Sequence, residues 1–292
     1  MKNTAKTFLK AKHQQKLTML TAYDYTMAQL MDAVGINGIL VGDSLGMVFQ
    51  GHEHTLGVTM DHMVYHTQVV SRGVKNALIV ADMPFMSYHL SPEQGLENAG
   101  RLVKEGGAQA IKLEGGQDMA ATIAKVVSAG IPVMAHIGMT PQSVNAYGGF
   151  LVQGKSLAAA QQIVSDALAV QAAGAFAVVL ECVPAALAEL ITQQLDIPTI
   201  GIGAGAGCDG QILVYQDMLG IATGYADDSQ SPKLPKFVKA YENLGSRIQT
   251  AFVDYISEVQ SGTFPQPAHT FTIDNAVIET LVQTFLDPNP RG

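Results

Sequence analysis

The chain has 292 residues, of which 48% are hydrophobic and 14% charged, so it can bury a large core. Its net charge of −8 argues against a nucleic-acid partner, because binding phosphates requires a basic face. The sequence holds no membrane-length apolar run and no signal peptide, and its two cysteines lack the spacing of a metal site. We therefore expect a soluble, cytoplasmic protein with small-molecule partners and no membrane association.

Eight short apolar runs predict β-strands. They are LTMLTAY (17–23), GILVGDS (38–44), NALIVADMP (76–84), AIKLEGG (110–116), PVMAHIGM (132–139), AFAVVLECV (175–183), PTIGIGAG (198–205) and QILVYQD (211–217). Most stay apolar until their last residues, which is typical of parallel strands covered on both faces. Eight strands in this order favour a (β/α)8 barrel over an open doubly wound sheet, although the pattern alone leaves both open.

Helical patterns separate several of these strands. The segment 91–108 begins with Ser91 as a candidate N-cap and Pro92 at the first helical position. The segments 116–130 and 156–174 also have helical spacing and end in glycine. Helices between consecutive strands supply the crossovers that parallel pairing requires.

The C-terminal quarter has a different pattern. Residues 224–236 are polar and predict a loop, and 237–262 have apolar residues in three-four steps, which predict a long amphipathic helical region with a candidate break at Gly245. We expect one barrel domain over residues 1–262, including these helices. The proline-rich residues 263–292 predict a tail that is partly extended or disordered.

Polar side chains gather where the predicted strands end. They are Asp43, Ser44, Asp82, Lys112, Glu114, His136 and Glu181. In a parallel barrel the carboxyl ends of the strands meet at one rim, and that rim carries the active site. Residues far apart in the sequence are therefore expected to converge.

Three of these residues, Asp43, Asp82 and Glu114, offer hard oxygen ligands of the kind that Mg²⁺ prefers. A divalent ion would also explain how three like charges share one place, because it offsets their repulsion. The alternative is that each carboxylate is a helix cap or a surface group. Their position on adjacent strand ends favours the metal site.

Within AIKLEGG, Lys112 and Glu114 point to the same face of the strand, since strand side chains alternate. Lys112 is a candidate anchor for an anionic substrate such as a carboxylate. Schiff-base chemistry is a competing role, but neighbouring carboxylates would keep the amine protonated. A structural ion pair between Lys112 and Glu114 is a third possibility.

Two further residues are candidates for proton transfer. Glu181 ends a strongly apolar strand, which is a suitable setting for a general base, although hydrogen bonding to loop amides would equally explain it. His136 is a possible accessory group, and its alternative role is that of a core histidine with satisfied hydrogen bonds.

Eleven motifs in order give the chain a close resemblance to the ketopantoate hydroxymethyltransferase family. They are TAYDY, LVGDSLGM, QGH, ADMPFMSY, IKLEGG, HIGMTPQSVN, GGF, VQG, LECVP, IGIGAG and DGQILV. The resemblance implies a (β/α)8 barrel of the phosphoenolpyruvate/pyruvate superfamily and assembly as a homodecamer. The chain departs from the family pattern at His54, in a longer loop at ADDSQSPKL, and in residues 272–292, which extend past the usual end.

The resemblance also implies the first committed step of pantothenate synthesis. A one-carbon unit would pass from 5,10-methylenetetrahydrofolate to 3-methyl-2-oxobutanoate and give 2-dehydropantoate through a magnesium-stabilised enolate, with one Mg²⁺ in each subunit. The matching positions assign the metal to Asp43, Asp82 and Glu114, substrate contacts to Asp43, Ser44, Asp82 and Lys112, and proton abstraction to Glu181.

Two other functions stay open at this point. One is another Mg²⁺-dependent lyase of 2-oxo acids from the same superfamily, although the K-K-C-G-H-type loop of such lyases is missing from the sequence. The other is a non-catalytic barrel that binds a metabolite.

Overall fold

Eight parallel strands close into a barrel in the computed structural model, which describes residues 2–221 and 234–286. The strands follow chain order around the barrel, and β1 also pairs with β8. They are β1 (Leu17–Thr21), β2 (Gly38–Val41), β3 (Leu78–Asp82), β4 (Ala110–Glu114), β5 (Val133–Gly138), β6 (Ala177–Glu181), β7 (Thr199–Ile202) and β8 (Gly210–Leu213). The predicted barrel is confirmed, and the open-sheet alternative is wrong.

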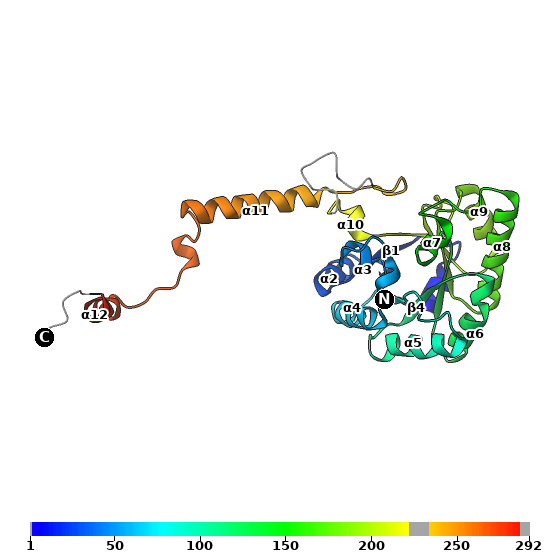
Figure 1. Ribbon diagram of the computed structural model, residues 1–292, viewed down its shortest axis with the longest axis horizontal. Helices are drawn as coiled ribbons and strands as arrows, with labels where there is room; N and C mark the ends of the chain where they lie inside the picture. Colours follow the sequence, from blue (N-terminus) through cyan, green and yellow to red (C-terminus); the bar gives the residue numbers. More distant parts are fainter. Residues whose placement is uncertain (1, 222–233, 287–292) are drawn as a thin grey trace.

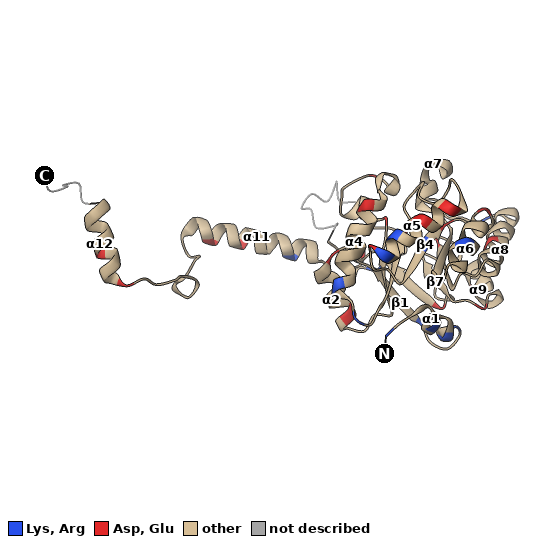
Figure 2. Cartoon of the chain, turned by 90° about the horizontal axis from the view of Figure 1, so that it is seen from below, with Lys and Arg blue, Asp and Glu red and all other residues tan. Residues whose placement is uncertain are grey.

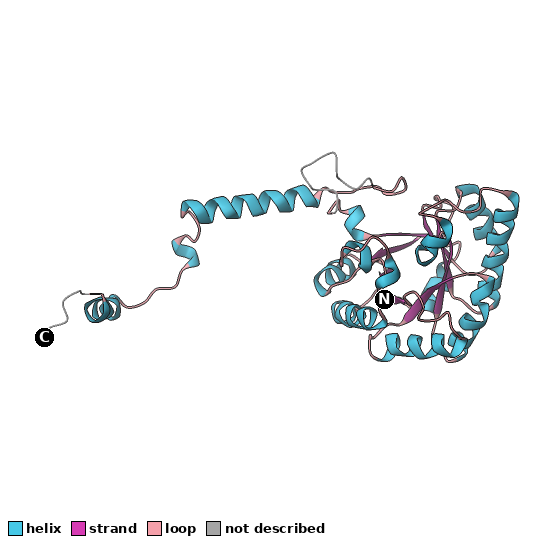
Figure 3. Cartoon of the chain, viewed as in Figure 1, coloured by secondary structure: helices cyan, strands magenta, loops and turns pink. Residues whose placement is uncertain are grey.

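Helices surround the strands on the outside (Figures 1 and 3). The α-helices are α1 (Ala5–Ala11), α2 (Tyr25–Ala33), α3 (Leu45–Val48), α4 (Met60–Gly73), α5 (Pro92–Lys104), α6 (Ala120–Ser128), α7 (Val144–Tyr147), α8 (Leu157–Ala172), α9 (Ala185–Gln194), α10 (Tyr215–Met218), α11 (Leu244–Ser261) and α12 (Asn275–Phe285). The 3-10 helices are η1 (Thr55–Gly57), η2 (Gln117–Met119), η3 (Pro141–Ser143) and η4 (Pro267–His269).

The helices that the sequence predicts between strands are present. The predicted segments 91–108, 116–130 and 156–174 correspond to α5, to η2 followed by α6, and to α8. Ser91 caps α5 by accepting a hydrogen bond from the Gln94 N–H, and Ser156 caps α8 in the same way. None of the helices in the described ranges is long and apolar enough to cross a membrane.

The core has two layers because strand side chains alternate between the barrel interior and the helices. The interior cluster includes Leu40, Val80, Met134, Val179 and Ile212. Except on β8, their sequence neighbours on the same strands pack outward against the helices in a second, larger cluster. This alternation decides which residues of each strand point into the barrel.

Helix α1 closes the base of the barrel, at the amino ends of the strands. Its Phe8 is fully buried in the interior cluster and packs edge-on against Phe176, with ring centroids 6.0 Å apart. Directly after α1, the Lys12 Nζ lies 2.8 Å from a carboxylate oxygen of Asp209 and also donates to the Thr192 carbonyl. Burial opposes ionisation of Asp209, but Lys12 and backbone N–H donors outweigh it and hold the pKa of that carboxyl below its usual range.

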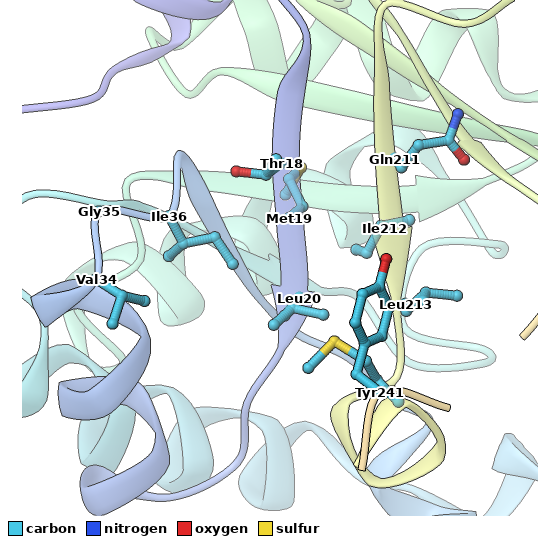
Figure 4. Close-up of a pocket in the computed structure, with 11 residues that line it drawn as sticks. Thr18, Met19, Leu20, Val34, Gly35, Ile36, Gln211, Ile212, Leu213 and Tyr241 are labelled. Atoms are coloured by element: carbon cyan, nitrogen blue, oxygen red, sulfur yellow. The ribbon is translucent and has the colours of Figure 1, made fainter. Parts of the chain in front are cut away.

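One sector of the barrel wall is open on its outer side. Along β1 and β8, Thr18 and Gln211 are exposed and Leu20 and Leu213 are only half-buried, whereas β2 to β5 are almost wholly buried. A groove of about 300 Å³ lies there (Figure 4). It is lined mainly by β1, β8, the turn after α2, and Tyr241.

The C-terminal arm, which we define as residues 244–286, projects away from the barrel and contains α11 and α12 (Figures 1 and 2). The long helix predicted over 237–262 begins only at Leu244, because the backbone N–H of Tyr241 bonds to Met218 and that of Leu244 to Leu219. Gly245 lies in the first turn of α11 and does not break it. Of the loop predicted at 224–236, only residues 234–236 lie within the described ranges.

Replacing Lys12 by Met should destabilise the barrel by about 3 kcal/mol, since it leaves the buried Asp209 carboxylate without its cation. The measurement is the free energy of unfolding in urea. The matched control is Lys10→Met, an exposed lysine of the same helix, which should change little. Equal stability of the two variants would contradict this role of Lys12.

Candidate active site

The seven polar residues predicted at the strand ends line a single pocket of about 510 Å³ at the carboxyl ends of the strands. They are Asp43, Ser44, Asp82, Lys112, Glu114, His136 and Glu181. Apolar side chains complete the wall, among them Leu40, Val179 and Ile212 from the barrel interior and Phe150 near the mouth. The convergence expected from the parallel strands is therefore observed.

The register of the strands pairs the charged residues. Asp82 of β3 lies opposite Lys112 of β4, and Glu114 of β4 lies opposite His136 of β5. The Lys112 Nζ is 2.9 Å from Asp82 Oδ1, and the His136 Nδ1 is 3.4 Å from Glu114 Oε1. The ion pair of Lys112 is thus formed with Asp82, and the alternative of a Lys112–Glu114 pair is not the arrangement found.

Asp43 joins this group from the end of β2. Its backbone N–H donates to Asp82 Oδ2 over 3.0 Å, and its side chain is 3% exposed. Burial, followed by the charges of Asp82 and Glu114, raises the pKa of Asp43 well above its usual range. Burial likewise raises the pKa of Asp82, although the Lys112 ammonium opposes that shift.

Lys112 and Glu114 remain charged in these surroundings. Burial acts against the ammonium of Lys112, but Asp82, Glu114 and Asp43 outweigh it and raise its pKa. Burial also opposes ionisation of Glu114, but His136, Lys112 and a backbone N–H lower its pKa. A lysine held protonated is a poor amine nucleophile, so the geometry disfavours Schiff-base chemistry.

His136 connects Glu114 to Glu181. Its Nε2 lies 3.3 Å from Glu181 Oε2 while its Nδ1 faces Glu114. Burial and the Lys112 charge oppose protonation of the imidazole, but the two carboxylates outweigh them and raise the pKa of His136 to about 9. The Glu181 side chain is 13% exposed, and the next residue, Cys182, adopts a left-handed backbone with φ 49°. That turn directs the chain away from the strand end directly after the carboxylate.

Ser44 lies at the start of α3, across the pocket mouth. Its Oγ is 2.8 Å from the Tyr23 hydroxyl, which is buried behind it. The sequence reasoning did not single out Tyr23, Tyr88 or Gln142, although all three lie within the motifs TAYDY, ADMPFMSY and HIGMTPQSVN. Gln142 is hydrogen-bonded to the carboxylates of Asp43 and Glu114, and the Tyr88 hydroxyl is hydrogen-bonded to the Glu114 backbone.

The carboxylates fit a divalent cation by their chemistry. Asp82 Oδ1 is buried with the Lys112 Nζ 2.9 Å away, and the three carboxylates outnumber the lysine beside them. Among the described residues, no three His, Cys, Asp or Glu side chains are arranged to enclose a metal ion by themselves. Mg²⁺ usually takes only one or two protein carboxylates and completes its octahedron with water and substrate oxygens.

The fold and the pocket define a (β/α)8 barrel with a candidate active site at the carboxyl ends of the strands. A family model described as ketopantoate hydroxymethyltransferase matches residues 2–267. The chain is 61% identical over 282 residues to the 3-methyl-2-oxobutanoate hydroxymethyltransferase of Enterococcus faecalis, and the match covers 96% of this chain and 100% of that relative. The chain therefore belongs to the ketopantoate hydroxymethyltransferase family and is an enzyme, so the alternative of a non-catalytic barrel is wrong.

Solved structures share the fold of this chain. The chain resembles 2,3-dimethylmalate lyase, a member of the PEP mutase/isocitrate lyase superfamily, with a TM-score of 0.57 at 14% identity over 97% of this chain and 91% of that one. It resembles phosphonopyruvate hydrolase in complex with oxalate and Mg²⁺ with a TM-score of 0.55 at 13% identity, over 98% of this chain and 100% of that one. These likenesses show the (β/α)8 barrel fold, and the superfamily stays a prediction.

The match to the Enterococcus faecalis relative also bears on the C-terminal segment. It leaves out about 4% of this chain, which is fewer residues than the 21 that form the segment 272–292. At least part of this segment is therefore shared with that relative, whereas the family model ends at residue 267.

Replacing Asp43 by Asn should make stability less sensitive to pH in metal-free buffer. Because the folded-state pKa of Asp43 is raised, folding keeps a proton that the unfolded chain releases above about pH 4. The contribution of Asp43 to the free energy of unfolding is complete below about pH 4. It is lost as pH rises, by up to about 1.4 kcal/mol per pH unit. In urea unfolding at about pH 5, 6 and 7, the free energy of unfolding of Asp43→Asn should increase relative to that of the wild type as pH increases.

The matched control is Asp254→Asn on the exposed surface of α11, whose stability should follow the wild type at each pH. If the stabilities of Asp43→Asn and the wild type change in parallel with pH, Asp43 does not carry a raised pKa.

Proposed function

We propose that this enzyme transfers a one-carbon unit from 5,10-methylenetetrahydrofolate to 3-methyl-2-oxobutanoate, with water, to give 2-dehydropantoate and tetrahydrofolate, a step of pantothenate synthesis. The observation that carries the proposal is a buried, protonated Lys112 between carboxylates, with Glu181 in the same pocket and His136 between them. A 2-oxo acid complements this pocket. Its anionic end can pair with the Lys112 ammonium, its carbonyl oxygen can accept a hydrogen bond or bind a cation, and its alkyl group can contact the apolar wall.

Asp43, Asp82 and Glu114 would hold Mg²⁺, with one ion in each subunit. When bound, Mg²⁺ supplies positive charge that offsets the negative charge developing on the keto oxygen of the substrate. The phosphonopyruvate hydrolase structure contains oxalate and Mg²⁺, and this likeness supports the choice of metal. The three carboxylates present oxygen ligands only, which suits a hard cation.

Lys112 and Ser44 would bind the carboxylate end of the 2-oxo acid. The ammonium of Lys112 is kept charged by Asp82 and is held at 2.9 Å from it, so its position is fixed before the substrate arrives. The Ser44 hydroxyl is also fixed in position, by a hydrogen bond with the Tyr23 hydroxyl. Fixed donors of this kind orient a substrate without the cost of ordering flexible side chains.

Glu181 would remove the C3 proton of the substrate and so form the enolate that attacks the one-carbon donor. The His136 Nε2 lies 3.3 Å from Glu181 Oε2, and its Nδ1 lies 3.4 Å from Glu114 Oε1 and 3.3 Å from the Lys112 Nζ. We assign His136 the role of positioning the base. The partial exposure of Glu181 agrees with a group that must reach the substrate.

Replacing Glu181 by Gln should slow deuterium exchange at C3 of 3-methyl-2-oxobutanoate by at least about 100-fold, because general-base catalysis typically contributes that much. The exchange is followed by NMR in ²H₂O with Mg²⁺ and without folate. The matched control is Glu189→Gln on the exposed side of α9, which should exchange at the wild-type rate.

Exchange by Glu181→Gln at the wild-type rate would remove Glu181 from the role of base. Omitting Mg²⁺ in the presence of EDTA should abolish exchange, and full exchange there would overturn the metal assignment. In the complete reaction, omission of methylenetetrahydrofolate should stop product formation, and turnover without it would overturn the folate requirement.

We also propose that the enzyme acts as a homo-oligomer, for which the family resemblance implies a decamer. The C-terminal arm exposes an apolar stripe on α11, in which Phe252, Tyr255 and Ile256 are each more than half exposed. The open groove along β1 and β8 is an apolar surface of the kind that such a stripe could cover in another copy (Figure 4). Large apolar surfaces are unfavourable when they are exposed on a monomer, and they commonly mark protein interfaces.

The double substitution Phe252→Glu and Ile256→Glu should lower the molar mass in solution, because it places charges on the exposed apolar stripe. The measurement is size-exclusion chromatography with light scattering. The matched control, Thr250→Glu with Ser257→Glu, changes the opposite face of α11 and should keep the wild-type mass. A monomeric wild type, or an unchanged mass for the stripe variant, would contradict this assembly.

A further inference from the structure

The carboxylate cluster is supported from behind by one amide side chain. Gln142 lies in η3, the short helix that follows β5, and is 5% exposed. Its Nε2 donates to Asp43 Oδ2 over 2.8 Å and to the Met83 carbonyl over 2.9 Å. Its backbone N–H donates to Glu114 Oε2 over 3.0 Å. One residue thereby contacts two of the three candidate metal ligands, which come from different strands.

The orientation of this amide is determined by its partners. Both partners of Nε2 are acceptors, so the nitrogen must face Asp43 and Met83. The remaining oxygen, Oε1, lies 2.7 Å from the Tyr88 hydroxyl. That hydroxyl accepts the Glu114 backbone N–H over 3.1 Å, and of its two acceptors Gln142 Oε1 is nearer than the Glu114 carbonyl at 3.2 Å. The amide cannot be reversed without placing two acceptors against each other.

The same network decides which carboxylate oxygens remain available. Asp43 Oδ2 accepts the Gln142 amide, which turns Oδ1 away from this donor. Glu114 Oε2 accepts the Gln142 backbone N–H while Oε1 faces His136. Since Asp43 and Glu114 repel each other, a neutral donor that is bonded to both limits how far they can separate.

We propose that Gln142 is a positioning residue, which fixes Asp43 against Glu114 in the arrangement that a divalent cation requires, and that Tyr88 holds Gln142 in turn. The inference rests on the proposed function, because it assumes that the carboxylates bind a cation. Outer partners of metal ligands typically contribute 10- to 100-fold to metal affinity. Neither residue is itself part of the pocket lining, so neither is assigned a contact with the substrate.

The test replaces Gln142 by Met, which keeps the length of the side chain and the backbone N–H to Glu114 but removes the amide. Binding of Mn²⁺, used as a probe for Mg²⁺, is measured on the full-length enzyme by electron paramagnetic resonance. We expect Gln142→Met to weaken Mn²⁺ binding at least about 10-fold and Tyr88→Phe to weaken it less. Because Tyr88 acts through Gln142, the double variant should bind no more weakly than Gln142→Met alone.

The matched control is Gln171→Met in α8, a half-buried glutamine whose Oε1 accepts two backbone N–H groups far from the pocket. It should lose stability and keep the wild-type affinity for Mn²⁺. For the reaction, Gln142→Met should raise the Mg²⁺ concentration that gives half-maximal rate, and saturating Mg²⁺ should restore most of kcat. A merely structural defect would lower kcat at every Mg²⁺ concentration.

The outcomes separate this inference from the proposed function. If the wild type binds no Mn²⁺ and needs no Mg²⁺, the metal assignment fails and the role of Gln142 fails with it. If the wild type binds Mn²⁺ and Gln142→Met binds it equally well, the positioning role alone is overturned. Equal weakening by Gln171→Met would also overturn it, because the effect would then follow from general destabilisation.

Discussion

Three carboxylates, Asp43, Asp82 and Glu114, are buried at the mouth of the barrel, and among the described residues their cationic partners are Lys112 and His136. Burial of charge is tolerated when each group is paired or hydrogen-bonded, and the penalty is large otherwise. Here the pairing is incomplete, as the raised pKa of Asp43 indicates. The rest of the site follows from this imbalance, because it favours an added cation and an anionic ligand beside Lys112.

The rigidity of the barrel makes such a cluster possible. Strand register places Asp82 against Lys112 and Glu114 against His136, so the contacts are set by backbone hydrogen bonds and not by flexible side chains. Asp43 follows its strand and has no register partner of this kind, and its carboxylate is held by Gln142 instead. The cluster thus depends on the sheet for two pairs and on a single side chain for its third carboxylate.

Much of this arrangement could be predicted from the sequence, because it depends on local regularities. Apolar runs ending in polar residues located all eight strands, and alternation placed Lys112 and Glu114 on one face. The partner of Lys112 could not be predicted in the same way, since it depends on the register between strands. Gln142 and Tyr88 gave no signal of their own, because their role arises where a turn folds back on another strand's end. The start of α11 was also missed, because backbone bonds to α10 override its apolar spacing.

A buried aspartate lies at each end of the barrel, and the pKa values of the two are shifted in opposite directions. At the base, Asp209 receives Lys12, two backbone N–H groups and the Thr199 hydroxyl, and its pKa falls. At the mouth, Asp43 accepts the Gln142 amide beside two other carboxylates, and its pKa rises. The first arrangement stabilises the fold, whereas the second destabilises the metal-free protein near neutral pH. A bound cation stabilises an aspartate with a raised pKa more than it stabilises one whose charge is already paired. The unfavourable burial of Asp43 in the metal-free protein therefore contributes to the affinity for a cation.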